Sequence, residues 1–341
     1  TINKSTDYFN TVTYSGTGSA QSITGVGFRP DWLWIKHRED VSNHKLQDVV
    51  RGSTKVIGSN ETSAEATVAQ GVTSFDSDGF SLGTDASVNG TGAAGIVAWN
   101  WLAGGSSGSA NSDGSISSTV SVNTTAGFSI VSWTGNGSAS TIGHGLGVTP
   151  NMILLKNRSE VYGWQVYHSF LGNTKYLALD GTDAQATSSQ SWNNTSPTSS
   201  VFSVGASDSN NKNGNNIIAY CFADKTGYSK FGSFLGNGNQ DGAFIYTGFK
   251  PAFFLMKEVT DAGTNWLMYD NKRNTSNPVD KVIYPNLNNA EGTGLDFDFL
   301  SNGLKCRTSN GGVNGNSNNY IYMCFASAPL VGTNDIPCTA R

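Results

Sequence analysis

The chain has 341 residues, more than one ordinary domain of about 100 to 200 residues and enough for two or three. Charged residues make up only 13% of the sequence and aromatic residues 11%, so the chain has the apolar area to fold, and its 41 glycines favour an all-β class. A formal net charge of -4 gives no basic excess for phosphate groups, and no apolar run approaches the roughly 18 residues that cross a bilayer, so neither nucleic acid nor membrane insertion is expected.

Residues 1–105 form the first of three similar stretches. An aromatic-x-Gly-x-Gly string, YSGTG, stands at 14–18; a proline-led apolar run that ends in lysine, GFRPDWLWIK, stands at 27–36; and a closing run, IVAWNWLA, stands at 96–103. A proline is compatible with the first position of a strand, which can forgo its hydrogen-bond donor. The residues after Pro30 do not alternate between apolar and polar, which predicts a strand covered on both faces.

The segment that follows has a different composition. Its Gly/Ser-rich opening predicts a flexible linker over 106–126, in which Ile116, Val120 and Val122 can add an edge strand. The string GGSSG at 104–108 matches the G-x-S-x-G pattern of serine hydrolases, but that pattern requires a strand before the serine and a helix after it. We therefore interpret the match as chance.

Two further stretches, 127–226 and 227–329, repeat the landmarks of the first in the same order. They read WTGNG (133–137), LGVTPNMILLK (146–156) and IIAYCFA (217–223), then FLGNG (234–238), GFKPAFFLMK (248–257) and IYMCFA (321–326). The matched proline lies 68, 69 and 71 residues before the aligned position of the closing run. This spacing predicts three units of about 100 residues, the size of a β-sandwich. Residues 330–341 are expected to be a C-terminal tail.

The predicted fold is therefore all-β, with three tandem antiparallel β-sandwich repeats in a compact tandem body or with pseudo-threefold symmetry. Apolar contacts between neighbouring repeats would cover the second face of each proline-led strand. Helices should be short, and 64–69 and 183–187 are the best candidates for one or two turns.

Residue types that carry catalysis or bind metals are few and poorly spaced. The four cysteines lack CxxC spacing and the four histidines lack HxxxH spacing, so neither a metal nor a cofactor is expected. His144 lies in a Gly-rich turn, where its ring is expected to bond to the backbone. Cys221 and Cys324 lie in apolar runs and are expected to be small buried hydrophobes, with a Cys306–Cys324 bridge as an open alternative. No catalytic residues are predicted, and the chain is expected not to be an enzyme.

One lysine closes the proline-led run of each unit. Lys36, Lys156 and Lys257 are expected to extend their charged ends from the strand to solvent, with Asp48 and Asp270 as partners in the first and third units. His168 stands at the matching position of the second unit, so that pairing is not expected in all three.

Aromatic residues beside polar turns suggest a recognition surface. Sugars bind to aromatic faces with short polar groups nearby, which makes five residues candidate ligand-binding positions. They are Trp164, Tyr167, Trp192, Trp266 and Tyr269. The alternative is that these rings belong to the core. We favour the core for Trp164 and Trp266, which align between units, and exposure for Trp192, which has no aligned partner.

Four segments carry a resemblance to a known family. They are Gly-Phe-Arg-Pro at 27–30 with the apolar-Lys-x-Arg ending that follows it, the run at 127–147, Gly-Tyr-Ser-Lys-Phe-Gly at 227–232 and the terminal Thr-Ala-Arg at 339–341. Together they resemble a family of tailed-bacteriophage virion proteins, tail-fibre or other structural components common in marine and cyanobacterial phages. The Pro-led strand, the Asp-Gly-Phe turn at 78–80 and the Trp-rich closing run make each unit loosely similar to the H-type lectin module, a sugar-binding β-sandwich.

The resemblance implies a location in the virion, with other virion proteins as partners. We expect a non-enzymatic phage appendage protein, tail-fibre-like, that contacts the host surface and binds glycan. The alternative is a structural virion component such as a capsid decoration protein. Low charge suits both roles, because a screened surface ion pair contributes little in salty water.

Overall fold

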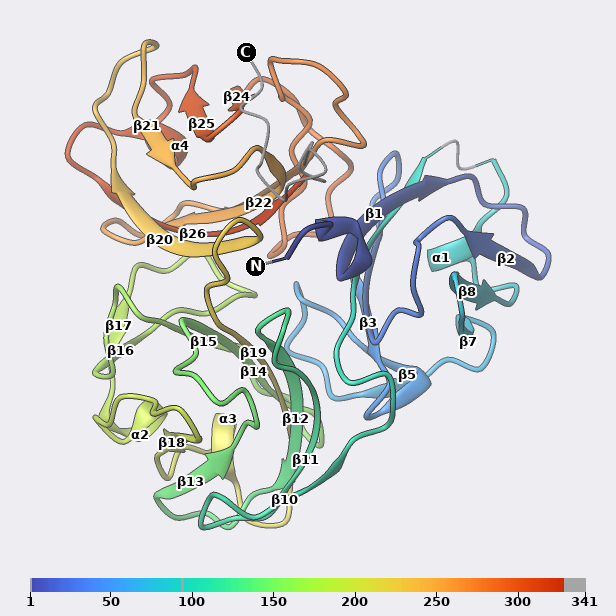
Figure 1. Cartoon of the computed structure of the whole chain (residues 1–341), viewed down its shortest axis with the longest axis vertical. Coiled ribbons are helices and arrows are strands. Elements are labelled where there is room, and N and C mark those ends of the chain that lie inside the picture. The colour runs from blue at the N-terminus through green and yellow to red at the C-terminus, as the bar shows by residue number, and fades with distance from the viewer. Residues whose placement is uncertain (1, 93–94, 328–341) are drawn as a thin grey trace.

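The computed structural model describes residues 2–92 and 95–327, so the predicted tail at 330–341 lies outside the described residues. Figure 1 shows three lobes around a common centre. We name them by their strands: β1 to β9 form the first lobe, β10 to β19 the second and β20 to β26 the third. All described strand pairs of the named strands are antiparallel, and the all-β prediction is confirmed.

The first lobe consists of a larger and a smaller sheet. The larger sheet has the order β1 (Phe9–Tyr14), β9 (Ile96–Trp101), β3 (Trp32–His37), β4 (Lys45–Asp48), β5 (Gly52–Ile57) and β6 (Ala66–Thr67). The smaller sheet has the order β2 (Gln21–Thr24), β8 (Gly79–Leu82) and β7 (Val72–Asp76). Apolar side chains between the two sheets, Ile23, Leu33 and Phe80 among them, form the core of this lobe.

The second lobe begins in the segment expected to be a linker. Its larger sheet has the order β10 (Ser109–Asn111), β11 (Ser118–Asn123), β12 (Phe128–Thr134), β19 (Asn216–Phe222), β14 (Met152–Asn157) and β15 (Gln165–His168). Two smaller sheets pair β13 (Ser140–Gly143) with β18 (Val201–Val204) and β16 (Lys175–Tyr176) with β17 (Ala186–Thr187). The segment 106–126 thus supplies two strands: β10 lies at the sheet edge, and β11 lies between β10 and β12.

The larger sheet of the third lobe has fewer strands than those of the other two lobes. Its order is β20 (Ser229–Leu235), β26 (Asn319–Ala326), β22 (Pro251–Glu258) and β23 (Trp266–Asp270). The smaller sheet has the order β21 (Phe244–Tyr246), β25 (Gly303–Cys306) and β24 (Phe297–Leu300). In all three lobes the closing strand lies between the opening strand and the proline-led strand.

The second faces of the three larger sheets meet in one central core. This core contains Trp32 and Trp101 from the first lobe, Tyr220 from the second, and Phe253 and Phe325 from the third. The proline-led strands β3, β14 and β22 are consequently buried at every position, which confirms the expectation from their unbroken apolar runs. The lobes therefore share a hydrophobic core and are not separate beads on a string.

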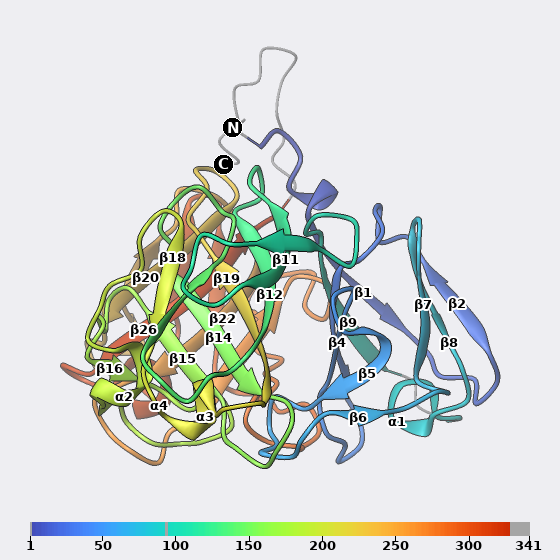
Figure 2. The same ribbon diagram turned by 90° about the horizontal axis from the view of Figure 1, so that it is seen from below.

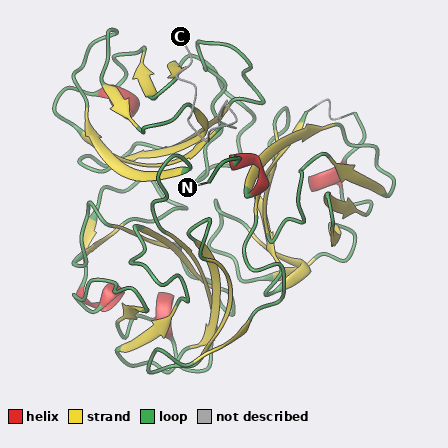
Figure 3. Cartoon of the chain, in the orientation of Figure 1, coloured by secondary structure: helices red, strands yellow, loops and turns green. Residues whose placement is uncertain are grey.

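Helices are single turns (Figure 3). They are α1 (Ala86–Asn89), α2 (Ser189–Trp192), α3 (Asp208–Asn211) and α4 (Gly311–Asn314), with a 3-10 turn at Ser5–Asp7. The prediction of helices at 64–69 and 183–187 is wrong, because those segments contain the strands β6 and β17. Their backbones bond across lobes: Glu65 N donates to the carbonyl of Arg158 at 2.9 Å, and Gln185 N to that of Val259 at 3.2 Å. No helix in the described ranges is long and apolar enough to cross a membrane.

The aromatic-x-Gly-x-Gly strings lie against three of the short helices. The second glycine of each string has a positive φ near 70°, which favours glycine. The first glycine has no room for a side chain. A Cβ at Gly16, Gly135 or Gly236 would lie 2.1, 2.3 or 2.1 Å from the carbonyl oxygen of Gly90, Lys212 or Gly315. The motif therefore marks a close backbone contact.

We expect Gly236→Ala to lower the free energy of unfolding by about 1 to 3 kcal/mol, because the methyl group must displace backbone at the end of α4. Gly311→Ala in the same helix is the matched control, since a Cβ there meets nothing within 4 Å and its φ is not positive. Urea unfolding of both variants checks the prediction. Equal stability of the two would contradict it.

The fold has two different ends, which Figure 2 separates. Phe9 and Trp32 pair with Trp101 at one end of the first sheet, while Tyr14 and His37 pair with Ile96 at the other. We name the first the terminal end, because the chain enters there before β1 and β26 ends there at Ala326. We name the second the loop end, because the loops 38–44, 158–164 and 259–265 that follow the proline-led strands lie there.

Candidate functional site

The five aromatic residues predicted to bind sugar are all buried. Trp164, Tyr167, Trp192, Trp266 and Tyr269 each expose 4% of their surface or less. Strands β15 and β23 are buried at every position, so neither face reaches solvent. The core interpretation is confirmed for Trp164 and Trp266. The expectation that Trp192 is exposed is wrong, because its ring packs edge-on against Tyr167 with centroids 5.7 Å apart.

The indole N–H groups of Trp164 and Trp266 join neighbouring lobes. A histidine takes the equivalent place in the first lobe, so each lobe makes one such contact to another. The contacts are Trp164 Nε1 to Gly58 O at 2.8 Å, Trp266 Nε1 to Ala178 O at 2.8 Å and His44 Nε2 to Tyr284 O at 3.0 Å. The second lobe thus bonds to the first, the third to the second and the first to the third, so the three contacts link the lobes in a ring.

The recurrent lysines are buried and do not reach solvent. The Nζ atoms of Lys36, Lys156 and Lys257 donate to carbonyl or hydroxyl oxygens of nearby loops, including Asp40 O at 3.3 Å, Thr62 O at 2.9 Å and Thr264 Oγ1 at 2.8 Å. Burial lowers the pKa of each to about 8. The expected pairing of these lysines with Asp48 and Asp270 is wrong, because arginines bind those carboxylates. The lysines fix loops at the loop end.

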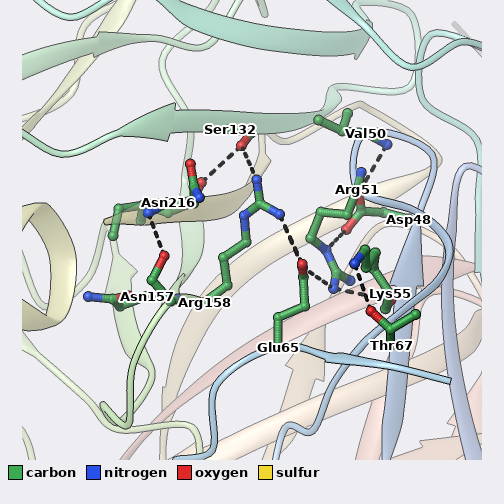
Figure 4. A network of polar contacts seen from close by, with 12 residues as sticks. Asp48, Val50, Arg51, Lys55, Glu65, Thr67, Ser132, Asn157, Arg158 and Asn216 are labelled. Atoms are coloured by element: carbon green, nitrogen blue, oxygen red, sulfur yellow. Dashed lines mark hydrogen bonds and ion pairs between the residues drawn. The ribbon is translucent and has the colours of Figure 1, made fainter. Parts of the chain in front are cut away.

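A buried polar network joins the first and second lobes (Figure 4). Arg51 Nε donates to Asp48 Oδ2 at 2.5 Å, and its Nη1 lies 3.2 Å from Glu65. Glu65 also accepts from Arg158 of the second lobe at 3.1 Å. The hydroxyl of Tyr220, again in the second lobe, donates to Asp48 at 2.8 Å. The carboxylates thus have cationic or hydroxyl partners, as buried charges require.

The same arrangement recurs between the third and first lobes. Arg273 donates to Asp270 at 2.5 Å and lies 3.0 Å from Glu291, which also binds Arg38 of the first lobe at 2.9 Å. Trp99 Nε1 donates to Asp270 at 3.0 Å, in the place that the Tyr220 hydroxyl takes at the other junction.

The junction between the second and third lobes replaces this network with uncharged groups. His168 stands where Asp48 and Asp270 stand, Leu171 replaces the arginine, and Gln185 and Val259 replace the bridging glutamate and its arginine. His168 Nε2 lies 3.3 Å from the carbonyl oxygen of Tyr322, and burial lowers its pKa to about 4. The charged residues are replaced together at this junction. Removal of only one partner would leave an unpaired buried charge.

The remaining reactive groups are also part of the framework. Cys221, Cys306 and Cys324 are buried free thiols whose pKa values burial raises, so the alternative of a Cys306–Cys324 bridge is wrong; Cys338 lies outside the described residues. His144 binds backbone as expected, with Nε2 at 3.2 Å from the oxygen of Thr198. In the described ranges no three His, Cys, Asp or Glu side chains are grouped to hold a metal ion.

Two aromatic residues outside the predicted set do reach solvent on one strand. Phe244 is 46% exposed and Tyr246 is 66% exposed, while Ile245 between them is buried in the core of the third lobe. Alternate residues of a strand point to opposite faces, so both rings lie on the outer face of the smaller sheet. β21 is an edge strand of that sheet. We call Phe244 and Tyr246 the aromatic edge.

Polar groups lie beside the aromatic edge on the paired strands. Lys305 pairs with Phe244 and forms an ion pair with Asp241 at 2.8 Å, and Asp298 on the next strand binds Arg307 at 2.5 Å. Gly303 pairs with Tyr246, and a Cβ there would lie 3.0 Å from the Phe244 ring. The missing side chain lets the ring lie close to the sheet, next to donors and acceptors.

The other two lobes carry no aromatic ring at these places. Ile23 and Ile142 take the buried place of Ile245 in strands β2 and β13. Their neighbours on the outer face are Ser22, Thr24, Thr141 and Gly143. The sandwich therefore does not need aromatic rings at this position. The sequence signal was the aromatic-Ile-aromatic alternation at 244–246, which the longer aromatic runs of β22 and β26 obscured.

Comparison with known proteins gives one match. A family model described as a domain of unknown function, DUF7483, matches residues 4–329, so the chain belongs to that family. No curated protein and no solved structure matches the chain.

Proposed function

We propose that this member of the DUF7483 family is a non-enzymatic virion appendage protein that binds carbohydrate on a host surface through the aromatic edge. The observation that carries the proposal is the exposed pair Phe244 and Tyr246. The pair lies in the third lobe, and the other two lobes have small residues at the equivalent positions. The placement in a virion rests on the resemblance to tailed-phage proteins. The buried charged networks described above join neighbouring lobes, whereas the aromatic edge is exposed and open to a ligand.

The chemistry of the aromatic edge suits a sugar. Exposed rings offer flat faces to the C–H side of a pyranose, and residues two apart on a strand lie about 7 Å from each other, so two rings can contact neighbouring sugar units. Lys305 and Asp241 at one end provide a donor and acceptors for hydroxyl groups. An open platform of this kind binds a chain of sugars along its length and needs no deep pocket.

Phe244→Ala combined with Tyr246→Ala is expected to weaken strongly the saturable binding of the purified, labelled chain to susceptible host cells. Loss of stacking from both rings should weaken binding by at least about tenfold, since one stacked ring contributes about 0.5 to 1.5 kcal/mol beyond its buried area. Flow cytometry with untreated and periodate-treated cells measures the effect. Periodate destroys sugar diols, so it should abolish wild-type binding as well.

Phe170→Ala is the matched control, because Phe170 is 48% exposed and lies in the second lobe, away from β21. It should bind cells as the wild type does. Wild-type binding that survives periodate, or a double variant that binds as well as the control, would refute the carbohydrate role of the aromatic edge.

A structural virion role is the second candidate, because β21 is an edge strand on the flank of the third lobe. Exposed edge strands with apolar side chains can pair with another chain. In that case the double variant should fail to enter particles when it replaces the wild type in the phage, and the purified wild type should not bind cells. Normal incorporation of the double variant would exclude this candidate.

A further inference from the structure

A pocket of about 270 Å³ lies at the terminal end, where the third lobe meets the first. Its lining residues come from the start of the chain, β1, the start of β22, the turn after β23 and the end of β26. They are Thr6, Phe9, Asn10, Thr11, Ala252, Asn271, Lys272, Ala326 and Ser327. Phe9 and the two alanines supply an apolar wall, and the other six supply hydroxyl, amide and ammonium groups. The volume lies just below the usual range for ligand pockets, about 300 to 1,000 Å³, and suits a single sugar ring.

One lining residue, Ala252, has a smaller side chain than the equivalent residues of the other two lobes. Asn271 N donates to Ala252 O, as Val49 N donates to Asp31 O and Ser169 N to Asn151 O, so Ala252, Asp31 and Asn151 are equivalent. Asp31 accepts from the amides of Ala103 and Gly105, and Asn151 from that of Asp224. Ala252 has no group that can do so. The third lobe therefore has free space where the others have a bonded side chain.

Lys272 adds a charge where the other lobes have apolar residues. Its backbone N–H donates to Asp270 Oδ1 at 2.9 Å, as that of Val50 donates to Asp48 and that of Phe170 to His168. Val50 packs against the central core, whereas the exposed Lys272 lines the pocket. None of the nine lining residues is acidic. A ligand that meets Lys272 here would meet a positive charge with no opposing carboxylate in the lining.

Thr11 gives the second, independent indication of a ligand. It is only 3% exposed, and its Oγ1 makes no hydrogen bond in the described part of the chain. A buried hydroxyl without a partner costs free energy, so native structures usually supply one. Thr11 lines the pocket, where a hydroxyl or carboxylate oxygen of a bound molecule can be that partner.

We propose that this pocket binds a sugar acid, a monosaccharide-sized molecule with one carboxylate. The carboxylate meets Lys272, the ring hydroxyls meet Thr11 and the amide of Asn271, and the C–H face of the ring lies on the Phe9 side. The site is separate from the aromatic edge, and the inference does not depend on the carbohydrate role proposed there.

Titration calorimetry with the full chain tests the proposal, with glucuronate as the probe and glucose as its uncharged analogue. Glucuronate should bind saturably with one site per chain, and glucose should bind at least about tenfold more weakly, because a hydrogen bond to a charged group is stronger than one between neutral groups. Lys272→Val, which introduces the residue of the first lobe, should lose tenfold or more in affinity for glucuronate. Lys250→Val, at another exposed lysine of the same end, should not.

Thr11→Val separates binding from folding. It removes the unpartnered hydroxyl without changing the shape of the side chain, so its thermal midpoint should equal or exceed that of the wild type while its affinity for glucuronate falls. No saturable heat with glucuronate, equal affinity for glucose, or equal affinity of the Lys272→Val and wild-type chains would each overturn the proposal and leave a pocket filled by water. Cell binding through Phe244 and Tyr246 is measured separately and is expected to be unaffected by Lys272→Val.

Discussion

Replacement of Arg51 by leucine is expected to lower the free energy of unfolding by about 3 to 5 kcal/mol, because it leaves a buried carboxylate without its cation. Asp48 and Arg51 are both fully buried and only 2.5 Å apart, and Arg51 also binds Glu65. The Tyr220 hydroxyl and the backbone N–H groups of residues 50 and 51 would then remain to bind Asp48, and none of them carries a charge. Urea unfolding followed by tryptophan fluorescence measures the change, since several indoles lie in the central core next to this junction.

The junction between the second and third lobes supplies the control for this prediction. There a histidine and a leucine, His168 and Leu171, replace the aspartate and arginine, so the double variant Asp48→His with Arg51→Leu reproduces a combination that the fold already tolerates. It should recover most of the stability lost by Arg51→Leu. If the single variant costs less than about 1 kcal/mol, or the double variant is less stable than the single, the charge compensation argued here is wrong.

Acidification should destabilise the protein by several kcal/mol between about pH 6.5 and pH 4, before most carboxylates titrate. Burial lowers the pKa of His44 to about 3 and that of His168 to about 4, from an ordinary value of 6.5. In this window the unfolded chain takes up a proton on each histidine and the folded chain does not. Stability is therefore complete above the unfolded pKa and falls as the pH falls.

The free energy of unfolding at successive pH values measures this effect, and His168→Asn tests its origin. The asparagine oxygen can still accept the backbone N–H of Phe170, which now donates to His168 Nδ1 at 3.2 Å. The variant should be somewhat less stable at pH 7 but should have a smaller slope between pH 6.5 and pH 4. An unchanged slope would show that His168 does not cause the acid sensitivity.

These two results would show that the junctions between lobes carry much of the stability. The three lobes also differ there, with charged networks at two junctions and uncharged groups at the third. Arg38 and Glu291, which join the first and third lobes, are 253 residues apart in the chain. A close pair of this separation is invisible to local sequence patterns.

Several features followed directly from the sequence. Unbroken apolar runs after Pro30, Pro150 and Pro251 predicted strands buried on both faces, because a half-exposed strand would alternate. The Gly-rich turn around His144 predicted a backbone contact for its ring, and the structure shows one. Composition alone was sufficient for the all-β class. These properties depend on residues close together in the chain or on totals over it.

The position of each aromatic ring and charge was decided by the tertiary structure. Trp164 and Trp266 were recognised as core residues only because they align, while Trp192 and Tyr167 lie beside polar turns and are nevertheless buried. Each lysine at the end of a proline-led strand is buried because loops, some of them from another lobe, fold over it. Which face of a strand meets solvent depends on what packs on it.

The sequence by itself thus determined the all-β class and the strands that are buried on both faces, since composition and hydrophobic pattern decide these. Only the tertiary structure decided which side chains are exposed on β21, which charges meet at the junctions, and where a pocket forms around Thr11 and Lys272. The physical reason is that burial and charge pairing are set by neighbours in space, and in this chain those neighbours come from different lobes.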